Sequence, residues 1–147
     1  MGVKTVGRKR WWSKAAAAVR PANTVLDIGP GIRPQTLVEC GHHICVEPHG
    51  EYVDVLRREY PGVEVMHCTW AQALDHFGAG SVDTVVLLDV IEHLDKEEGR
   101  RLLDRTVHLA RSQVVVFTPF GFVPQGEDED RDAWGLHGTE WQVHRSG

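Results

Sequence analysis

Five short runs rich in Val and Ile alternate with longer helix-like segments along this chain, and this alternation limits its fold more than any other feature. Each run is bounded by Gly, Pro or charged residues, and the five cover residues 24–28, 43–47, 63–67, 82–88 and 113–118. Several are apolar almost throughout, as strands are when helices cover both faces of a sheet. Strands that alternate with helices form parallel sheets. We therefore predict an α/β fold: a Rossmann-like, doubly wound and mainly parallel sheet with about five clear strands.

Two segments between these runs, 51–60 and 95–110, repeat apolar residues at helical spacing. The second begins with Asp95 and has Glu98 three residues later, which is typical of a capped helix start. The chain has no internal repeat and no linker that would divide it, and its 147 residues suit one domain with a hydrophobic core.

Composition nevertheless divides the chain into three parts. Residues 1–22 carry six Lys or Arg side chains and no acid. Because the net charge of the whole chain is −5, the net charge of the remaining residues is −11. We predict a basic N-terminal helix that Trp11 and Trp12 dock on the body. A nucleic-acid patch is the alternative, which the acidic remainder disfavours. Residues 23–120 contain the predicted sheet, and residues 121–147 include an acidic loop whose five acids, between Glu127 and Asp132, we expect to be solvated.

Neither membrane nor disulfide signals are present in the sequence. The longest apolar run, residues 84–91, is interrupted by Asp89 and is far shorter than the roughly 20 residues that cross a bilayer. The three cysteines, Cys40, Cys45 and Cys68, are an odd number without CxxC spacing. This argues against a disulfide framework or a zinc site and favours a reducing compartment, so we expect a cytoplasmic protein without a membrane partner.

The first predicted strand ends in a turn, VLDIGPG, that suits a ligand. In open parallel sheets, ligands bind at the carboxyl ends of the strands. Gly29 and Gly31 permit a tight bend and a close approach to backbone N–H groups, and Asp27 offers a carboxylate to a cationic group. We expect a helix to open near Pro34 and direct its positive end at the ligand. A dinucleotide would need a third glycine where Pro34 stands, which disfavours a nicotinamide-dependent oxidoreductase.

Glu47 ends the second predicted strand, twenty residues after Asp27. An acid at this position can accept hydrogen bonds from both hydroxyls of a ribose. The sequence therefore predicts a nucleoside site between the first two strands.

Three stretches occur in a consistent order, VLDIGPG (25–31), VEP (46–48) and VDTVVLLDVIEHL (82–94). Together they resemble the first motif, the ribose-binding acid and the fourth-strand motif of the class I S-adenosylmethionine-dependent methyltransferases, over roughly residues 23–120. This resemblance implies S-adenosylmethionine as the cofactor.

The resemblance also implies roles for individual residues. Asp27 would lie near the methionine amino group, Glu47 would hold the ribose, and Asp89 would lie close to the sulfonium. Pro48 or the neighbouring His49 would flank the adenine. Where the family often has an Asp before a helix, this chain has Thr69 and Trp70, so a backbone N–H would replace the side-chain contact. The remaining implied contacts to the cofactor come from Gly29, Pro30, Gly31, Thr69, Trp70 and Ala71.

His93, in DVIEH, is the candidate general base, since a neutral imidazole can take a proton from an oxygen or nitrogen nucleophile. The alternative is that it only holds the loop. Asp89, Glu92 and His93 also resemble an acid-x-x-Glu-His pattern that binds a divalent metal in some O-methyltransferases, with His137 or His144 as a fourth ligand. Because Asp89 is shorter than the usual Glu and the fourth ligand is not fixed, we predict no metal.

We predict an S-adenosylmethionine-dependent methyltransferase that acts on O or N of a small molecule, with nucleic acid disfavoured as the acceptor. The family's sheet usually has seven strands, and the C-terminal strand pair is missing from this pattern, so residues 121–147 form an incomplete acceptor-side segment in which Trp134 and Trp141 could line a pocket. The open edge at 113–118 would be covered by residues 120–147 or by a second copy in a homodimer. The alternative function is a noncatalytic S-adenosylmethionine-binding or interaction module.

Overall fold

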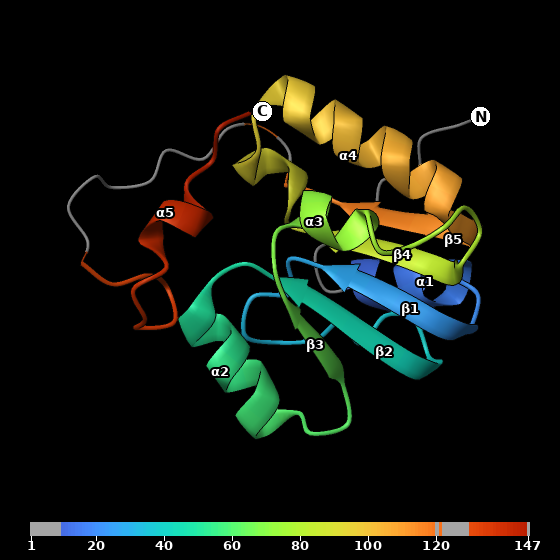
Figure 1. Ribbon diagram of the computed structural model, residues 1–147, viewed down its shortest axis with the longest axis horizontal. Coiled ribbons are helices and arrows are strands. Elements are labelled where there is room, and N and C mark those ends of the chain that lie inside the picture. The colour runs from blue at the N-terminus through green and yellow to red at the C-terminus, as the bar shows by residue number, and fades with distance from the viewer. Residues whose placement is uncertain (1–9, 120, 122–129, 147) are drawn as a thin grey trace.

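A single parallel sheet forms the centre of the protein in the computed structural model, which describes residues 10–119, 121 and 130–146. The strand order is β3-β2-β1-β4-β5, and every neighbouring pair is parallel (Figure 1). The strands are β1 (Ala22–Ile28), β2 (Cys40–Glu47), β3 (Glu64–His67), β4 (Val82–Leu88) and β5 (Ala110–Phe117). The predicted α/β, doubly wound sheet with five strands is confirmed. The order reverses between β1 and β4, which is where ligands bind in such sheets.

Helices flank the sheet on both faces. They are α1 (Trp11–Ala18), α2 (Gly50–Glu59), α3 (Trp70–Leu74), the 3-10 turn η1 (Ile91–His93), α4 (Lys96–Leu109) and α5 (Thr139–Gln142). One face of β1, β2 and β4 packs on α3 and α4, through a buried cluster that includes Leu26, Leu74 and Leu102. The other face packs through Val25, Val38 and Val86, with Val19 at the end of α1 lying against them.

The expected helix near Pro34 does not form, and this prediction was wrong. Residues 29–39 follow an irregular path between β1 and β2. A proline disfavours the helical conformation of the residue before it, which is Arg33 here. Gln35 holds the segment instead: its side-chain oxygen accepts hydrogen bonds from the backbone N–H groups of Leu37 and Val38, each at 2.7 Å.

The N-terminal part begins with α1, and residues 1–9 lie outside the described residues. Trp11 stacks on Phe117 with ring centroids 4.5 Å apart and planes 11° apart, while Trp12 is 38 % exposed. One of the two tryptophans therefore docks the helix on the end of β5. β5 is an edge strand of the described sheet, and Val116 on it is 42 % exposed. Of the predicted cover, residues 120, 122–129 and 147 lie outside the described residues, and the described residues 130–146 pair with no strand of the sheet.

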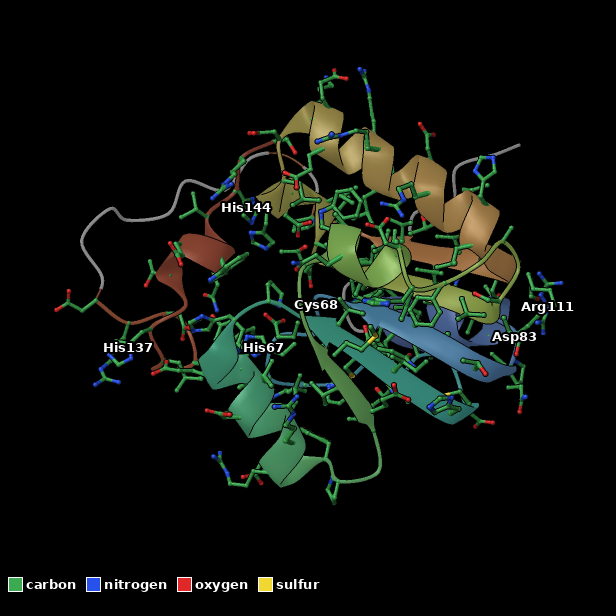
Figure 2. The ribbon with its side chains drawn as sticks, in the orientation of Figure 1. His67, Cys68, Asp83, Arg111, His137 and His144 are labelled. Carbon is green, nitrogen blue, oxygen red and sulfur yellow. The ribbon has the colours of Figure 1, made fainter. Side chains whose placement is uncertain are left out.

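Asp83 joins three strands at the amino end of the sheet. Its Oδ2 accepts hydrogen bonds from the backbone N–H groups of Asn23 (3.0 Å) and Thr24 (2.9 Å). Its Oδ1 forms an ion pair with Arg111 at 2.7 Å, and the two side chains meet at the edge of the molecule in Figure 2. These bonds hold the pKa of Asp83 below its usual value, although burial opposes them. Among the described residues, no helix is both long and apolar enough to cross a membrane.

Candidate functional site

The turn after β1 adopts the conformation that its glycines allow. Gly29 and Gly31 have φ angles of +67° and +61°, a region that other residues avoid. A Cβ at Gly29 would lie 3.1 Å from Val90, and a Cβ at Gly31 would collide with the ring of Trp134. Both glycines are therefore needed for backbone conformation and for close packing.

A cavity of about 300 Å³ lies beside this turn, at the carboxyl ends of β1, β2 and β4. Its volume is at the lower end of the range for small-molecule sites. Nine of the residues predicted from the sequence line it: Gly29, Gly31, Glu47, Pro48, Thr69, Trp70, Ala71, Asp89 and His93. Residues far apart in the sequence are thus brought to one cavity. Two predicted residues, Asp27 and Pro30, are not among those that line it.

Asp27 points away from the cavity, contrary to the sequence-based expectation that it faces the ligand. Successive side chains of a strand point to opposite faces of the sheet, and the next residue, Ile28, is the one that lines the cavity. The Asp27 Oδ2 atom accepts a hydrogen bond from the backbone N–H of Gln35 at 2.8 Å and lies 3.1 Å from His43 Nε2. Asp27 is 2 % exposed, so it supports the turn from behind.

Glu47 bridges the ends of the first two strands. Its Oε2 accepts a hydrogen bond from the backbone N–H of Gly31 (3.1 Å), and its Oε1 accepts one from the backbone N–H of His49 (2.9 Å). Burial raises the pKa of Glu47 to about 7, against the opposing effect of these two hydrogen bonds. The side chain is thus a buried carboxyl group fixed in position at the wall of the cavity.

The start of α3 forms another part of the wall. Thr69 caps the helix reciprocally with Gln72: the Thr69 hydroxyl accepts from the Gln72 N–H, and the Gln72 side chain accepts from the Thr69 N–H at 2.9 Å. The indole N–H of Trp70 donates to Glu98 at 3.2 Å, which fixes the ring between α3 and α4. The backbone at residues 69–71 is therefore rigid where it borders the cavity.

Asp89 follows β4 and has a φ angle of 54°, the only positive value at a non-glycine residue in the described chain. Such conformations cost free energy and cluster at functional sites. Burial raises the pKa of Asp89, and the nearby negative charge of Glu92 raises it further. The strand end therefore presents a strained and solvent-exposed carboxyl group at the cavity.

A second group of polar side chains adjoins Asp89. Potential ligand atoms of Glu92, His93 and His144 lie within 4.8 Å of one another. Glu92 is 4 % exposed; its Oε2 accepts from the Thr118 hydroxyl at 3.2 Å, whereas its Oε1 is buried without a hydrogen-bond partner in the described structure. Burial lowers the pKa of His93, and the backbone carbonyl of Val143, 3.2 Å from its Nδ1, opposes this effect.

The two histidines proposed as a fourth ligand are placed differently. His144 is 8 % exposed and its ring lies 5.1 Å from that of His93. His137 is on the outside, where it binds Glu51 through its Nδ1 at 2.9 Å, and Figure 2 shows the two histidines well apart. Only His144 is therefore in reach of the Glu92–His93 pair.

Residues 130–146 form the outer wall of the cavity, through Trp134, Trp141 and neighbours. Tyr52 anchors this segment: its hydroxyl donates to Asp132 Oδ2 at 2.5 Å. The other oxygen of Asp132 accepts from the backbone N–H groups of Trp134 (2.8 Å) and Leu136 (3.0 Å). Asp132 is 9 % exposed, so the expectation that it is a solvated acid was wrong. No local sequence pattern indicates this pair, because its members are 80 residues apart.

Searches with the sequence found no matching family model and no matching curated protein. The fold does match solved structures. A methyltransferase dependent on S-adenosylmethionine, from Archaeoglobus fulgidus, superposes with a TM-score of 0.57 at 21 % identity, over 76 % of this chain and 50 % of that one.

Two further matches show how widely this fold is used. The N-methyltransferase NodS from Bradyrhizobium japonicum has a TM-score of 0.51 at 13 % identity, over 70 % of this chain and 60 % of that one. A Rhodobacter sphaeroides protein described as a zinc-dependent alcohol dehydrogenase has a TM-score of 0.55 at 19 % identity, over 71 % of this chain and 44 % of that one. The chain thus has the Rossmann-like fold of these enzymes and spans about half the length of the structures it matches.

Proposed function

We propose that this chain binds S-adenosylmethionine in the cavity at the ends of β1, β2 and β4 and transfers its methyl group to O or N of a small molecule. The observation that carries the proposal is the convergence on one cavity of the glycine turn, Glu47, the start of α3 and Asp89. The likeness of the fold to methyltransferase structures supports it.

Glu47 is the residue proposed to hold the ribose. Each carboxylate oxygen has two lone pairs, so Glu47 can accept hydrogen bonds from ribose hydroxyls while it keeps those from Gly31 and His49. The backbone of Gly29 and Gly31 would contact the methionine part of the ligand. Pro48 and the segment of Thr69, Trp70 and Ala71 would border the adenine.

Asp89 and His93 are the residues proposed to lie closest to the methyl group. A sulfonium is a cation, so the carboxyl group of Asp89 is a suitable neighbour for it. Methyl transfer requires alignment of the acceptor with the C–S bond and exclusion of water, which a cavity closed by residues 130–146 can provide. His93 lines the same cavity, and burial lowers its pKa, so its neutral imidazole can take the proton of the acceptor.

A metal-assisted form of this reaction is a second candidate, since Glu92 has a buried oxygen without a partner among the described residues. Carboxylate and imidazole ligands suit a divalent cation such as Mn²⁺. Glu92, His93 and His144 would hold it, with Asp89 beside them. A cation there would polarise an acceptor hydroxyl. In a titration with Mn²⁺ followed by electron paramagnetic resonance, the parent protein should change the signal of the ion and the His144→Ala variant should not. If the parent leaves the signal unchanged, the metal-assisted form of the reaction is excluded.

Calorimetry tests the cofactor proposal directly. We expect S-adenosylmethionine and its demethylated product to bind, and NAD not to bind. Glu47→Gln should weaken binding about tenfold or more, because one of the two acceptor oxygens is replaced by an NH₂ group that cannot accept a hydrogen bond. Glu59→Gln, an exposed acid on the last turn of α2, is the matched control and should bind as the parent does. NAD binding, or unchanged affinity in Glu47→Gln, would contradict the proposal.

The catalytic step needs its own measurement. Production of the demethylated cofactor in the presence of small alcohols, phenols or amines would identify the acceptor class. A noncatalytic module would bind the cofactor and never turn it over. His93→Ala should retain cofactor affinity and lose methyl transfer; equal turnover in that variant would remove His93 from the reaction.

A further inference from the structure

Three side chains on the face of the sheet opposite the cavity combine an oxygen, a nitrogen and a sulfur donor. We propose that Asp27, His43 and Cys45 form a binding site for a transition-metal ion such as Zn²⁺, directly behind the glycine turn. This site is separate from the cavity, and the proposal does not depend on the function proposed above.

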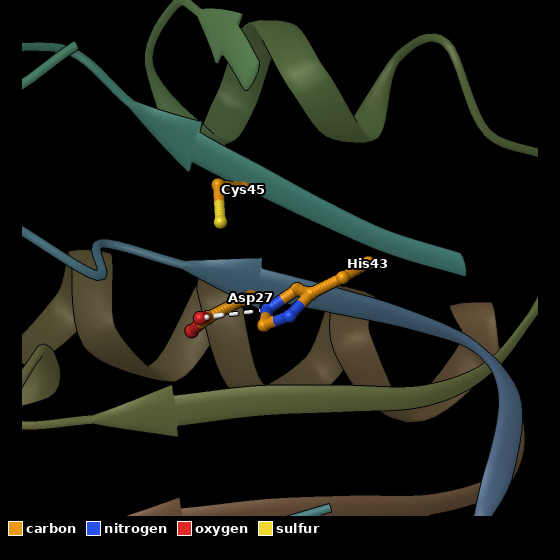
Figure 3. A group of neighbouring side chains, drawn as sticks. All are labelled: Asp27, His43 and Cys45. Atoms are coloured by element: carbon orange, nitrogen blue, oxygen red, sulfur yellow. Dashed lines mark hydrogen bonds and ion pairs between the residues drawn. The ribbon is translucent and has the colours of Figure 1, made fainter. Parts of the chain in front are cut away.

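The parallel register of β1 and β2 brings the three residues together. Asp27 and Cys45 are directly paired across the two strands. His43 precedes Cys45 by two residues, so both side chains project from the same face of β2. All three potential ligand atoms lie within 4.8 Å of one another. Figure 3 shows the His43 ring directed at the Asp27 carboxylate, with the Cys45 side chain projecting from β2 toward β1. The sequence signal is an acid at the end of one strand and His-x-Cys on the next.

The spacing of the donors suits a small tetrahedral ion. The two ligand atoms Asp27 Oδ2 and His43 Nε2 are 3.1 Å apart. Ligands about 2.1 Å from zinc in a tetrahedron lie roughly 3.4 Å from each other. The separation that a zinc ion needs between this pair is therefore close to the observed one. The Cys45 sulfur lies within 4.8 Å of both atoms, so a shift of at most about 1 Å brings it to the roughly 3.6 Å that a tetrahedral zinc ion requires.

The donor types select the class of metal. Ca²⁺ and Mg²⁺ require six or more oxygen ligands, and this cluster offers one carboxylate. A thiolate together with an imidazole and a carboxylate suits Zn²⁺ and Co²⁺. The fourth position would be taken by water or by Cys40, which packs on the hydrophobic cluster of this same face. On binding, the Cys45 thiol loses its proton to solvent, and His43 presents the Nε2 lone pair while its proton resides on Nδ1.

The three side chains are largely buried, and His43 is the most exposed of them. Asp27 is 2 % exposed and Cys45 is fully buried, while the side chain of His43 retains 13 % exposure. The ion would enter past His43. Because Asp27 also accepts the hydrogen bond from Gln35, the ion would connect β1, β2 and the irregular segment between them. A structural role, which holds the base of the turn, follows from this position.

Titration of the reduced full chain with Co²⁺ tests the site. A cobalt–thiolate bond gives a charge-transfer absorption that carboxylate and imidazole ligands alone do not, so the Glu92–His93–His144 group cannot produce it. We expect one equivalent of Co²⁺ to give this absorption and an excess of Zn²⁺ to abolish it.

Variants then identify the ligands. Cys45→Ser and His43→Gln should remove the absorption, whereas Cys68→Ser should retain it, because Cys68 packs on the opposite face with α3 and α4. Circular dichroism establishes that each variant is folded, and the partly exposed His43→Gln keeps the test decisive if Cys45→Ser unfolds. Absence of the absorption in the parent, or its loss in Cys68→Ser but not in His43→Gln, would overturn the proposal.

Discussion

The hydrogen bond between Tyr52 and Asp132 should account for a measurable share of the protein's stability. Tyr52 is 2 % exposed on α2, and its hydroxyl also accepts a hydrogen bond from the Gln142 amide at 3.1 Å. Tyr52→Phe keeps the ring, which packs edge-on against His49 and Trp134 at centroid distances of 4.4 Å and 5.0 Å. The substitution therefore removes one polar atom and changes little else.

The expected cost follows from the type of bond that is lost. A hydrogen bond to a charged group contributes about 1.5–3 kcal/mol, and Asp132 would remain buried with one donor fewer. We expect Tyr52→Phe to lower the free energy of unfolding by about 2 kcal/mol. For a chain of this size that corresponds to a fall in Tm on the order of 6 °C.

Equilibrium unfolding in urea, followed by circular dichroism, measures this quantity. Tyr60→Phe is the matched control, because Tyr60 is 36 % exposed and is the other tyrosine of the chain. The effect should also depend on pH: burial raises the pKa of Asp132, but its hydrogen bonds outweigh this and lower it overall. The stability that these hydrogen bonds contribute is fully present above the pKa of Asp132 in the unfolded chain, and it is lost as pH falls through the pKa of Asp132 in the folded protein. The free energies of unfolding of the parent and of Tyr52→Phe should therefore become equal in acid. If Tyr52→Phe lowers the free energy of unfolding by less than about 0.5 kcal/mol at neutral pH, or if Tyr60→Phe lowers it by the same amount, the hydrogen bond does not have the role given to it.

Three other substitutions test the fold around the site. Gly31→Ala should cost at least about 1–2 kcal/mol in urea unfolding, because the left-handed conformation disfavours a Cβ, whereas Gly62→Ala, with open space around it, should not. Asp83→Asn should reduce stability at neutral pH and have little effect in strong acid. The pKa of Asp83 is lower in the folded protein than in the unfolded chain, so its carboxylate stabilises the fold fully above the unfolded pKa and loses this effect as pH falls through the folded pKa; an equal loss at both pH values would contradict this. Trp11→Ala should lower Tm more than Trp12→Ala, because only the former ring stacks on β5; the reverse order would exclude docking through that ring.

Local patterns were sufficient to predict the sheet and most of the cavity. The Val- and Ile-rich runs identify strands because a buried parallel strand needs apolar side chains on both faces. Glu47 and Asp89 both line the cavity, because the ends of neighbouring parallel strands meet at one edge of the sheet; their contacts with a cofactor stay a prediction.

Two features could not be predicted in the same way. The orientation of Asp27 depends on which of two adjacent strand residues faces the cavity, and the acid was assigned there from its place at the strand end, before the glycine turn, and from its motif. The burial of Asp132 depends on a contact with a residue 80 positions earlier. Within the sequence, Asp132 resembles the acids beside it, so no local rule separates it from them.

The outer wall of the cavity has a consequence for how ligand and chain depend on each other. Its floor comes from strand ends before residue 90, and its cover from residues 130–146. Packing of residues 130–146 over the cavity and binding of a small molecule are therefore thermodynamically coupled. Each raises the equilibrium constant of the other by the same factor. Residues 130–146 would have to leave the ribosome before any ligand could be enclosed, and an occupied protein would resist proteolysis within this segment better than an empty one.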